Sequence, residues 1–199
     1  MSTIDLTTPR ENNYIVHPQK FGLWLFILTV IMIFGGFTSA YIVQRGAVPE
    51  ASRIFFQLPD FMWYYLVVMI VSSITMQYSV WSNKRGQKSQ ALLGLGTTLV
   101  LGGAFLYGQW DAFVAMTQSG LPFVDDRRLD NSISFFYVIA GVHGLHIVAA
   151  ILAVFSTFWQ LATDSFGAGR RRVVFEMTAT FWHFLGLLWL YLFLFLTYA

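Results

Sequence analysis

Long apolar runs alternate with short polar stretches along this chain. The hydrocarbon core of a bilayer is about 30 Å thick, so a spanning helix needs about 20 apolar residues. Five runs are long enough, at 21–43, 61–81, 91–113, 134–161 and 177–198. The fourth exceeds what a membrane requires, so it is expected to tilt or to project beyond the lipid. The pattern predicts an all-α membrane protein, in which a polar tail (1–20) precedes a single five-transmembrane-helix bundle (21–199).

The composition agrees with a lipid environment. Hydrophobic residues make up 56% of the chain and charged residues only 11%, whereas soluble domains carry about 25% charged residues. The sequence has no cysteine, which excludes disulfides, iron–sulfur clusters, thiolate copper centres and cysteine nucleophiles. The basic residues form no extended stripe, so nucleic acid is not an expected partner.

Lysine and arginine predict the orientation in the membrane. Of the twelve basic residues, eight fall on one predicted side (Arg10, Lys20, Lys84, Arg85, Lys88, Arg170, Arg171, Arg172) and four on the other (Arg45, Arg53, Arg127, Arg128). The positive-inside rule places the N-terminus in the cytoplasm and the C-terminus outside. Five tryptophans lie near predicted helix ends, as an interfacial aromatic belt requires: Trp24, Trp63, Trp81, Trp110 and Trp159.

Pairs of small residues four positions apart predict close helix contacts, because they let two backbones approach. Three such pairs occur: Gly36 with Ala40, Ala104 with Gly108, and Ala140 with Gly144.

Ionisable residues at membrane depth are candidate functional sites. His143, His146 and His183 lie inside apolar runs, and Asp111 lies near the end of one. His143 and His146 share a helix face, because residues three apart are neighbours. The helical zinc pair instead uses an i, i+4 spacing with a carboxylate, and the run 134–161 contains no carboxylate. A haem would need axial ligands on facing helices, which His183 could supply opposite His143 or His146.

The favoured interpretation is a structural polar cluster without a metal. At 1.5 Å per residue, His146 lies about 18 Å below the outer surface and His183 about 21 Å. The two side chains could therefore meet, and the sequence predicts a cluster of His143, His146 and His183.

Four stretches carry a family resemblance. "FFYVIAGVHGLHIVAAI" (135–151) resembles the penultimate helix of cytochrome c oxidase subunit III, and "FEMTATFWHFLGLLWLYLFLF" (175–195) resembles its last helix. "FGLWLFILTVIMIFGGFTSAY" (21–41) is similar to the first core helix of that family, and "LPDFMWYYLVVMIVSSIT" (58–75) to its serine-rich helix. The motif and helix-packing residues on these stretches are Gly141, Gly144, Trp182, Phe184, Ser72, Ser73 and Thr75.

The resemblance implies a short, five-helix bacterial subunit III of a haem-copper terminal oxidase, in the bacterial cytoplasmic (inner) membrane. Such a subunit carries no catalytic residue and no cofactor of its own. The haem and copper belong to partner subunits, and the complex reduces oxygen to water and moves protons. The implied partners are subunit I as the main contact, subunit II, membrane phospholipid, and further candidates in subunit IV and a respiratory supercomplex. The electron donor, cytochrome c or a quinol, stays open.

The chain departs from the family pattern at three acids. Val30 follows Thr29 where the family usually has a glutamate, and Gly186 stands where it has an aspartate. Ala112 occupies a further glutamate position, with Asp111 one residue earlier. The remaining candidate acidic sites are Asp111 and Glu176. Two alternatives stay open, a haem-binding membrane anchor of a respiratory dehydrogenase and a small transporter. The absence of an internal repeat and of a charged mid-membrane site argues against the transporter.

Overall fold

Five long helices make up the structure, a computed structural model that describes residues 18–49, 62–118, 132–165 and 170–198. They are α1 (Pro18–Ala47), α2 (Met62–Lys84), α3 (Lys88–Gln118), α4 (Ser132–Ala162) and α5 (Arg170–Tyr198). Each is long and apolar enough to cross a membrane, and no strand occurs among these residues. The predicted all-helical architecture with five candidate spans is confirmed.

Three of the five helices, α1, α3 and α4, extend beyond the predicted apolar runs at both ends, whereas α2 and α5 extend beyond them at one end. The largest difference is in α5, which begins at Arg170 and not at residue 177. Its added turns carry Arg171, Arg172 and Glu176. A hydropathy criterion ends a predicted span at such residues, although the backbone hydrogen bonds of a helix continue into the polar interface.

The turn between α2 and α3 follows a common helix-ending pattern. Gly86 has φ +75°, and its N–H donates to the carbonyl of Asn83 (3.1 Å), while the N–H of Gln87 donates to the carbonyl of Ser82 (3.0 Å). A residue without a side chain adopts this left-handed conformation at little cost. The tight turn sets α2 antiparallel to α3.

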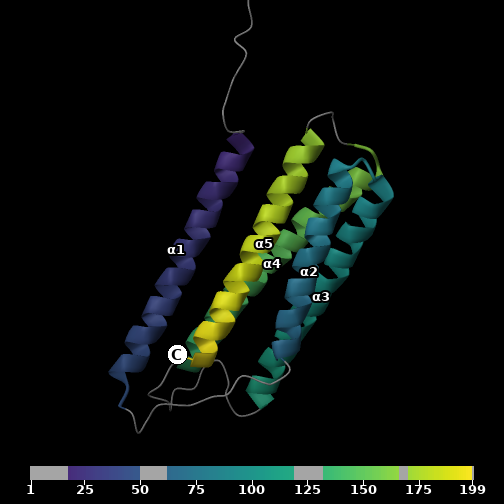
Figure 1. The fold of residues 1–199 in the computed structure, drawn as a ribbon. Coiled ribbons are helices and arrows are strands. Elements are labelled where there is room, and N and C mark those ends of the chain that lie inside the picture. Colours follow the sequence, from purple (N-terminus) through teal and green to yellow (C-terminus); the bar gives the residue numbers. More distant parts are fainter. Residues whose placement is uncertain (1–17, 50–61, 119–131, 166–169, 199) are drawn as a thin grey trace, which may run out of the picture.

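The helices run alternately up and down, and α1 stands at one side of the bundle (Figure 1). Among the described residues α1 packs on α4 and α5. The helices α2 and α3 form a hairpin, in which α2 packs on α5 and α3 packs on α4. Half of the most apolar window of α5 is buried, against 22% of that of α1. The fold is therefore organised around α5 and α4, with α1 as the least embedded helix.

One end of the bundle is basic. The starts of α1, α3 and α5 and the ends of α2 and α4 gather there (Figure 1). We call it the basic end; its described cations are Lys20, Lys84, Arg85, Lys88, Arg170, Arg171 and Arg172. Lys88 donates a hydrogen bond to Asp164 (2.5 Å), just after α4, and Arg171 lies 3.6 Å from the same carboxylate. The hydrogen bond from Lys88, with the positive charges of Lys88 and Arg171, holds the pKa of Asp164 below its usual value.

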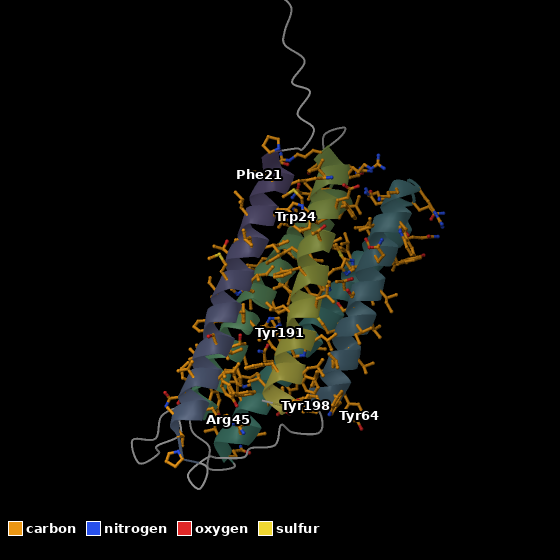
Figure 2. The ribbon with its side chains drawn as sticks, turned by 60° about the vertical axis from the view of Figure 1, so that its left-hand side comes forward. Phe21, Trp24, Arg45, Tyr64, Tyr191 and Tyr198 are labelled. Atoms are coloured by element: carbon orange, nitrogen blue, oxygen red, sulfur yellow. The ribbon has the colours of Figure 1, made fainter. Side chains whose placement is uncertain are left out.

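Aromatic side chains surround the bundle near both ends. Phe21 and Trp24 lie towards the start of α1, whereas Tyr64 and Tyr198 lie at the opposite end (Figure 2). The five tryptophans predicted to form an interfacial belt are all exposed on the outer surface: Trp24, Trp63, Trp81, Trp110 and Trp159. Such exposure fits a lipid-facing position, where amphipathic rings are favoured.

Small residues make the closest helix contacts, but only partly at the predicted pairs. A Cβ on Gly108 would meet the ring of Tyr65, and one on Gly94 would lie 2.8 Å from Cβ of Ser79, so both residues sit in the α2–α3 interface. Gly144 faces Gln109 across the α3–α4 contact. The prediction fails at Gly36, which faces open space, since that face of α1 is turned away from the bundle.

Two more predicted contact residues need correction. Gly141 faces open space as well, and Ala104 is exposed. The spacing of small residues identifies helices capable of close approach, but it does not identify the face that has a neighbour within this chain.

Gly94→Ala tests the α2–α3 contact. The added methyl group would meet the backbone of Ser79 at 3.1 Å, which no side-chain rotation can relieve. We expect the substitution to lower the free energy of unfolding by about 1–3 kcal/mol, the usual cost of overpacking. Gly103→Ala is the control, because nothing lies within 4 Å of its added Cβ. Equal unfolding midpoints for the two variants in an SDS titration would contradict the close approach.

Candidate functional site

His183 joins α5 to α2 through both of its ring nitrogens. Nδ1 lies 2.5 Å from Oγ of Ser73, and Nε2 lies 3.2 Å from Oε1 of Gln77. One tautomer satisfies both contacts, with the hydroxyl donating to Nδ1 and Nε2–H donating to the amide oxygen. Ser73 and Gln77 are four residues apart, so they present adjacent polar groups on one face of α2.

Trp182, the preceding residue, makes a parallel contact. Its indole N–H donates to Oγ of Ser72 (3.1 Å). The indole ring is fully buried. It packs against Gly102 of α3 so closely that a Cβ added to Gly102 would lie 2.7 Å from the ring. The Trp-His pair of α5 therefore binds the Ser-Ser pair of α2. Ser72, Ser73 and Trp182 were predicted as motif residues and His183 as a member of the histidine cluster, but the sequence did not indicate that the two pairs contact each other.

The polar contacts continue along the α2–α3 interface. The hydroxyls of Thr75 and Thr98 lie 2.9 Å apart, and Ser79 donates to the carbonyl of Ala91 (2.7 Å). Thr75 was a predicted motif residue, whereas Thr98 and Ser79 were not. Their signal was available, since each is a hydroxyl within an apolar run.

His143 occupies a different environment, an aromatic box between α1, α3, α4 and α5. Its ring is fully buried, stacks on Trp189 with centroids 5.1 Å apart, and meets Phe34 and Phe105 edge-on. Neither ring nitrogen has a hydrogen-bond partner among the described residues. His143 therefore acts in the bundle as a packed aromatic ring.

His146 lies one turn further along α4. Its Nδ1 donates to the carbonyl of Val142 in the same helix (2.8 Å), and its ring packs against Phe34 and Phe26 of α1. The predicted pairing of His146 with His183 is wrong. His183 has both nitrogens engaged by α2 on one side of α5, whereas His146 packs on α1. The depth estimate addressed height in the membrane, but not the face of each helix.

The two candidate acids differ. Glu176 accepts from Lys20 of α1 (2.6 Å) and lies 3.7 Å from Lys84 of α2 and 3.6 Å from Arg172. It therefore links three helices at the basic end. Asp111 is exposed on the surface of α3. Phe184, the last of the predicted motif residues, is partly buried against the apolar core.

The histidine geometry disfavours a haem anchor. Axial ligation needs two imidazole nitrogens that face each other across the haem, whereas those of His183 both contact α2. Among the described residues no group of three or more His, Cys, Asp or Glu side chains could hold a metal ion.

Comparison with known proteins decides the family. Residues 7–199 match the sequence profile of the family described as cytochrome c oxidase subunit III. The chain belongs to the cytochrome c oxidase subunit III family. It is 30% identical over 178 residues to cytochrome bo(3) ubiquinol oxidase subunit 3 of Pseudomonas aeruginosa, with 87% of this chain and 81% of that protein covered.

Two further relatives carry the cytochrome c oxidase name. Cytochrome c oxidase subunit 3 of Thermostichus vulcanus is 26% identical, over 89% of this chain and 86% of the relative. The corresponding protein of Bacillus sp. PS3 is 24% identical, over 93% and 88%. This chain is a haem-copper oxidase subunit III, and its relatives include subunits named for both kinds of oxidase.

The structure locates the positions at which the resemblance to the subunit III family indicated missing acids. Val30 is fully buried in α1, and Ala112 is buried in α3. Gly186 of α5 faces Met69 of α2, and a Cβ added to Gly186 would lie 3.6 Å from the Met69 methyl group. At two of the three positions, an apolar side chain fills a closed interface in place of an acid.

Matched substitutions separate the half-buried His183 from the fully buried His143. His183→Leu leaves the polar groups of Ser73 and Gln77 unpaired, so we expect it to lower the free energy of unfolding by about 1–3 kcal/mol. His143→Leu removes no hydrogen bond and is expected to change it by less, because only ring stacking is lost. The readout is the SDS-unfolding midpoint of each purified variant.

The double variant His146→Leu/His183→Leu is a further check on the geometry. The two side chains share no partner, so their effects are expected to add within about 0.5 kcal/mol. A larger interaction energy would show that they are coupled and would contradict the observed separation.

Proposed function

We propose that this chain is a non-catalytic, stabilising subunit of a bacterial haem-copper terminal oxidase, which packs on subunit I and binds lipid. The observation that carries the proposal is the use of the intramembrane polar side chains. Ser72, Ser73, Trp182 and His183 join helices to one another, and His143 is enclosed by aromatic rings. These contacts hold the bundle together.

The charged residues support the same proposal. Glu176 and Asp164 pair with basic residues at one end of the bundle, and no cysteine is present. Oxygen reduction requires redox centres, so the haem and copper would lie in partner subunits. Subunit I is the proposed main contact, with subunit II, subunit IV and a respiratory supercomplex as further candidates. Relatives named for cytochrome c and for ubiquinol leave both donors as candidates.

The decisive experiment is purification of the tagged chain from its native membranes. The chain is expected to co-purify with a haem-copper subunit I, which mass spectrometry and the haem spectrum identify. A Soret band in the isolated chain, lost in His183→Ala, would overturn the proposal in favour of the haem anchor.

We further propose that the basic end faces the cytoplasm in the bacterial inner membrane, as the excess of lysine and arginine favours. The native chain lacks cysteine, so single-cysteine variants report one site each. Arg85→Cys and Arg171→Cys are expected to resist a membrane-impermeant thiol reagent added outside, whereas Gly46→Cys, exposed at the opposite end, is expected to react. The reverse pattern would invert the orientation.

A stabilising role predicts a particular kinetic defect. In the intact complex, His183→Leu is expected to leave the initial rate of oxygen reduction unchanged, because no chemistry occurs at this residue. Activity should then decline faster during turnover, as the loosened subunit protects its neighbour less well. Oxygen consumption followed over many turnovers measures the initial rate and the rate at which activity is lost. The matched control is His143→Leu. An immediate loss of activity with the subunit still bound would instead assign His183 to the chemistry or to a proton path.

A further inference from the structure

Four buried polar atoms gather in the half of the bundle away from the basic end. They are Oε1 of Gln109, both ring nitrogens of His143 and Nε1 of Trp189, and none has a hydrogen-bond partner among the described residues. The side chains come from α3, α4 and α5, and none is more than 6% exposed. Each unpaired atom is costly at this place, because hydrocarbon offers it no partner.

The three side chains lie at a similar depth. At 1.5 Å per residue, His143 lies about 17 Å from the start of α4, and Gln109 and Trp189 lie about 14 Å from the ends of α3 and α5. Those helix ends meet opposite the basic end (Figure 1). Phe105, one turn before Gln109, meets the rings of both His143 and Trp189 edge-on, so α3 carries Gln109 next to the aromatic box.

Gln109 packs on the face of α4 that carries His143. Its amide nitrogen donates to the carbonyl of Ala140 (2.5 Å), and its amide oxygen would lie 3.4 Å from a Cβ added to Gly144. Ala140 lies three residues before His143 and four before Gly144, so the three positions share one helix face. The unpaired amide oxygen is therefore placed beside this face.

Gly144 leaves room next to that oxygen. Beyond its chain neighbours and its own helix, nothing lies nearer to the added Cβ than Oε1 of Gln109 at 3.4 Å, an ordinary van der Waals distance. The space is thus about the size of a methyl group. A water molecule needs a space of about one sphere of 1.4 Å radius, which the glycine provides.

The unpaired atoms match the hydrogen-bonding capacity of water. The oxygen of Gln109 only accepts, the indole N–H of Trp189 only donates, and the neutral imidazole of His143 offers one N–H and one acceptor nitrogen. A water molecule donates two hydrogen bonds and accepts two. Buried waters typically make about three hydrogen bonds to polar groups that have no other partner. An ion is disfavoured, because donors and acceptors are equally represented.

We propose that one structural water binds between α3, α4 and α5. It donates to Oε1 of Gln109 and to the acceptor nitrogen of His143, and it accepts from the N–H of Trp189. The N–H of His143 stays within the aromatic box, where ring faces accept weak N–H···π contacts. The water joins three helices through one polar contact. The inference goes beyond the proposed function, because it concerns the chain with or without partner subunits.

Water-edited solid-state NMR of the full chain in lipid bilayers tests the site. The chain has only four histidines, so isotope-labelled histidine gives four ring signals, and His143→Leu identifies that of His143 by its loss. Magnetisation is expected to pass from water to the His143 ring, although this ring is fully buried. Trp189→Phe keeps an aromatic ring on His143 and removes the indole N–H, so it should weaken the transfer.

Gly144→Ala fills the space, and Gly141→Ala is the matched control. Both variants place alanine in the middle of α4 and gain the same helix propensity, but nothing lies within 4 Å of a Cβ added to Gly141. Gly144→Ala is expected to abolish the transfer from water to His143, and Gly141→Ala to preserve it. Gly144→Ala should also unfold at a lower SDS concentration than Gly141→Ala, because Gln109 and Trp189 lose their partner.

Absence of transfer to His143 in the wild type, or transfer that survives in Gly144→Ala, would overturn the water site. So would equal unfolding midpoints for the two glycine variants. His143→Leu is still expected to cost less than His183→Leu, because the water keeps Gln109 and Trp189 and no residue is left unpaired. None of these measurements requires subunit I, so their outcome is separate from the co-purification that tests the proposed function.

Discussion

Helices in lipid gain nothing from burying apolar side chains against each other, because the surrounding hydrocarbon is equally apolar. Association has to come from close packing and from hydrogen bonds between helices. Each packed helix pair of this bundle meets that requirement in one of these ways. Ser73 and Ser72 join α2 to α5, Gln109 donates to a carbonyl of α4, and hydroxyls of Thr157 and Thr178 join α4 to α5. The α1–α4 contact uses aromatic edges on His146.

This requirement explains which parts of the fold could be predicted from sequence. The five spans follow from hydropathy, because the membrane sets their length and leaves few alternatives. The helix ends did not follow, since charged turns such as Arg170–Glu176 continue past the apolar limit. The exposure of Gly36 could not be predicted from sequence either, because a residue pattern along one helix does not indicate which neighbouring helix each face contacts.

The histidines show the same limit at the site. Their importance for packing followed from polarity inside apolar runs, but the pairing did not. His183 has its partners 106 and 110 residues earlier in the chain, and only the three-dimensional arrangement brings α2 beside α5. The sequence therefore indicated two separate features, the pair Ser72–Ser73 and the pair Trp182–His183, although in the structure the two pairs contact each other.

The position of α1 has a consequence for biogenesis. Its neighbours within the chain are α4 and α5, which are synthesised well after it, so α1 enters the membrane before either exists. A helix in that situation must be stable in lipid alone. With a peak hydropathy of 2.1 and only 22% of that window buried in the finished bundle, α1 satisfies this condition. The ion pair of Lys20 with Glu176 can form only after the start of α5 has emerged, so closure of the bundle on α1 is a late, post-insertion step.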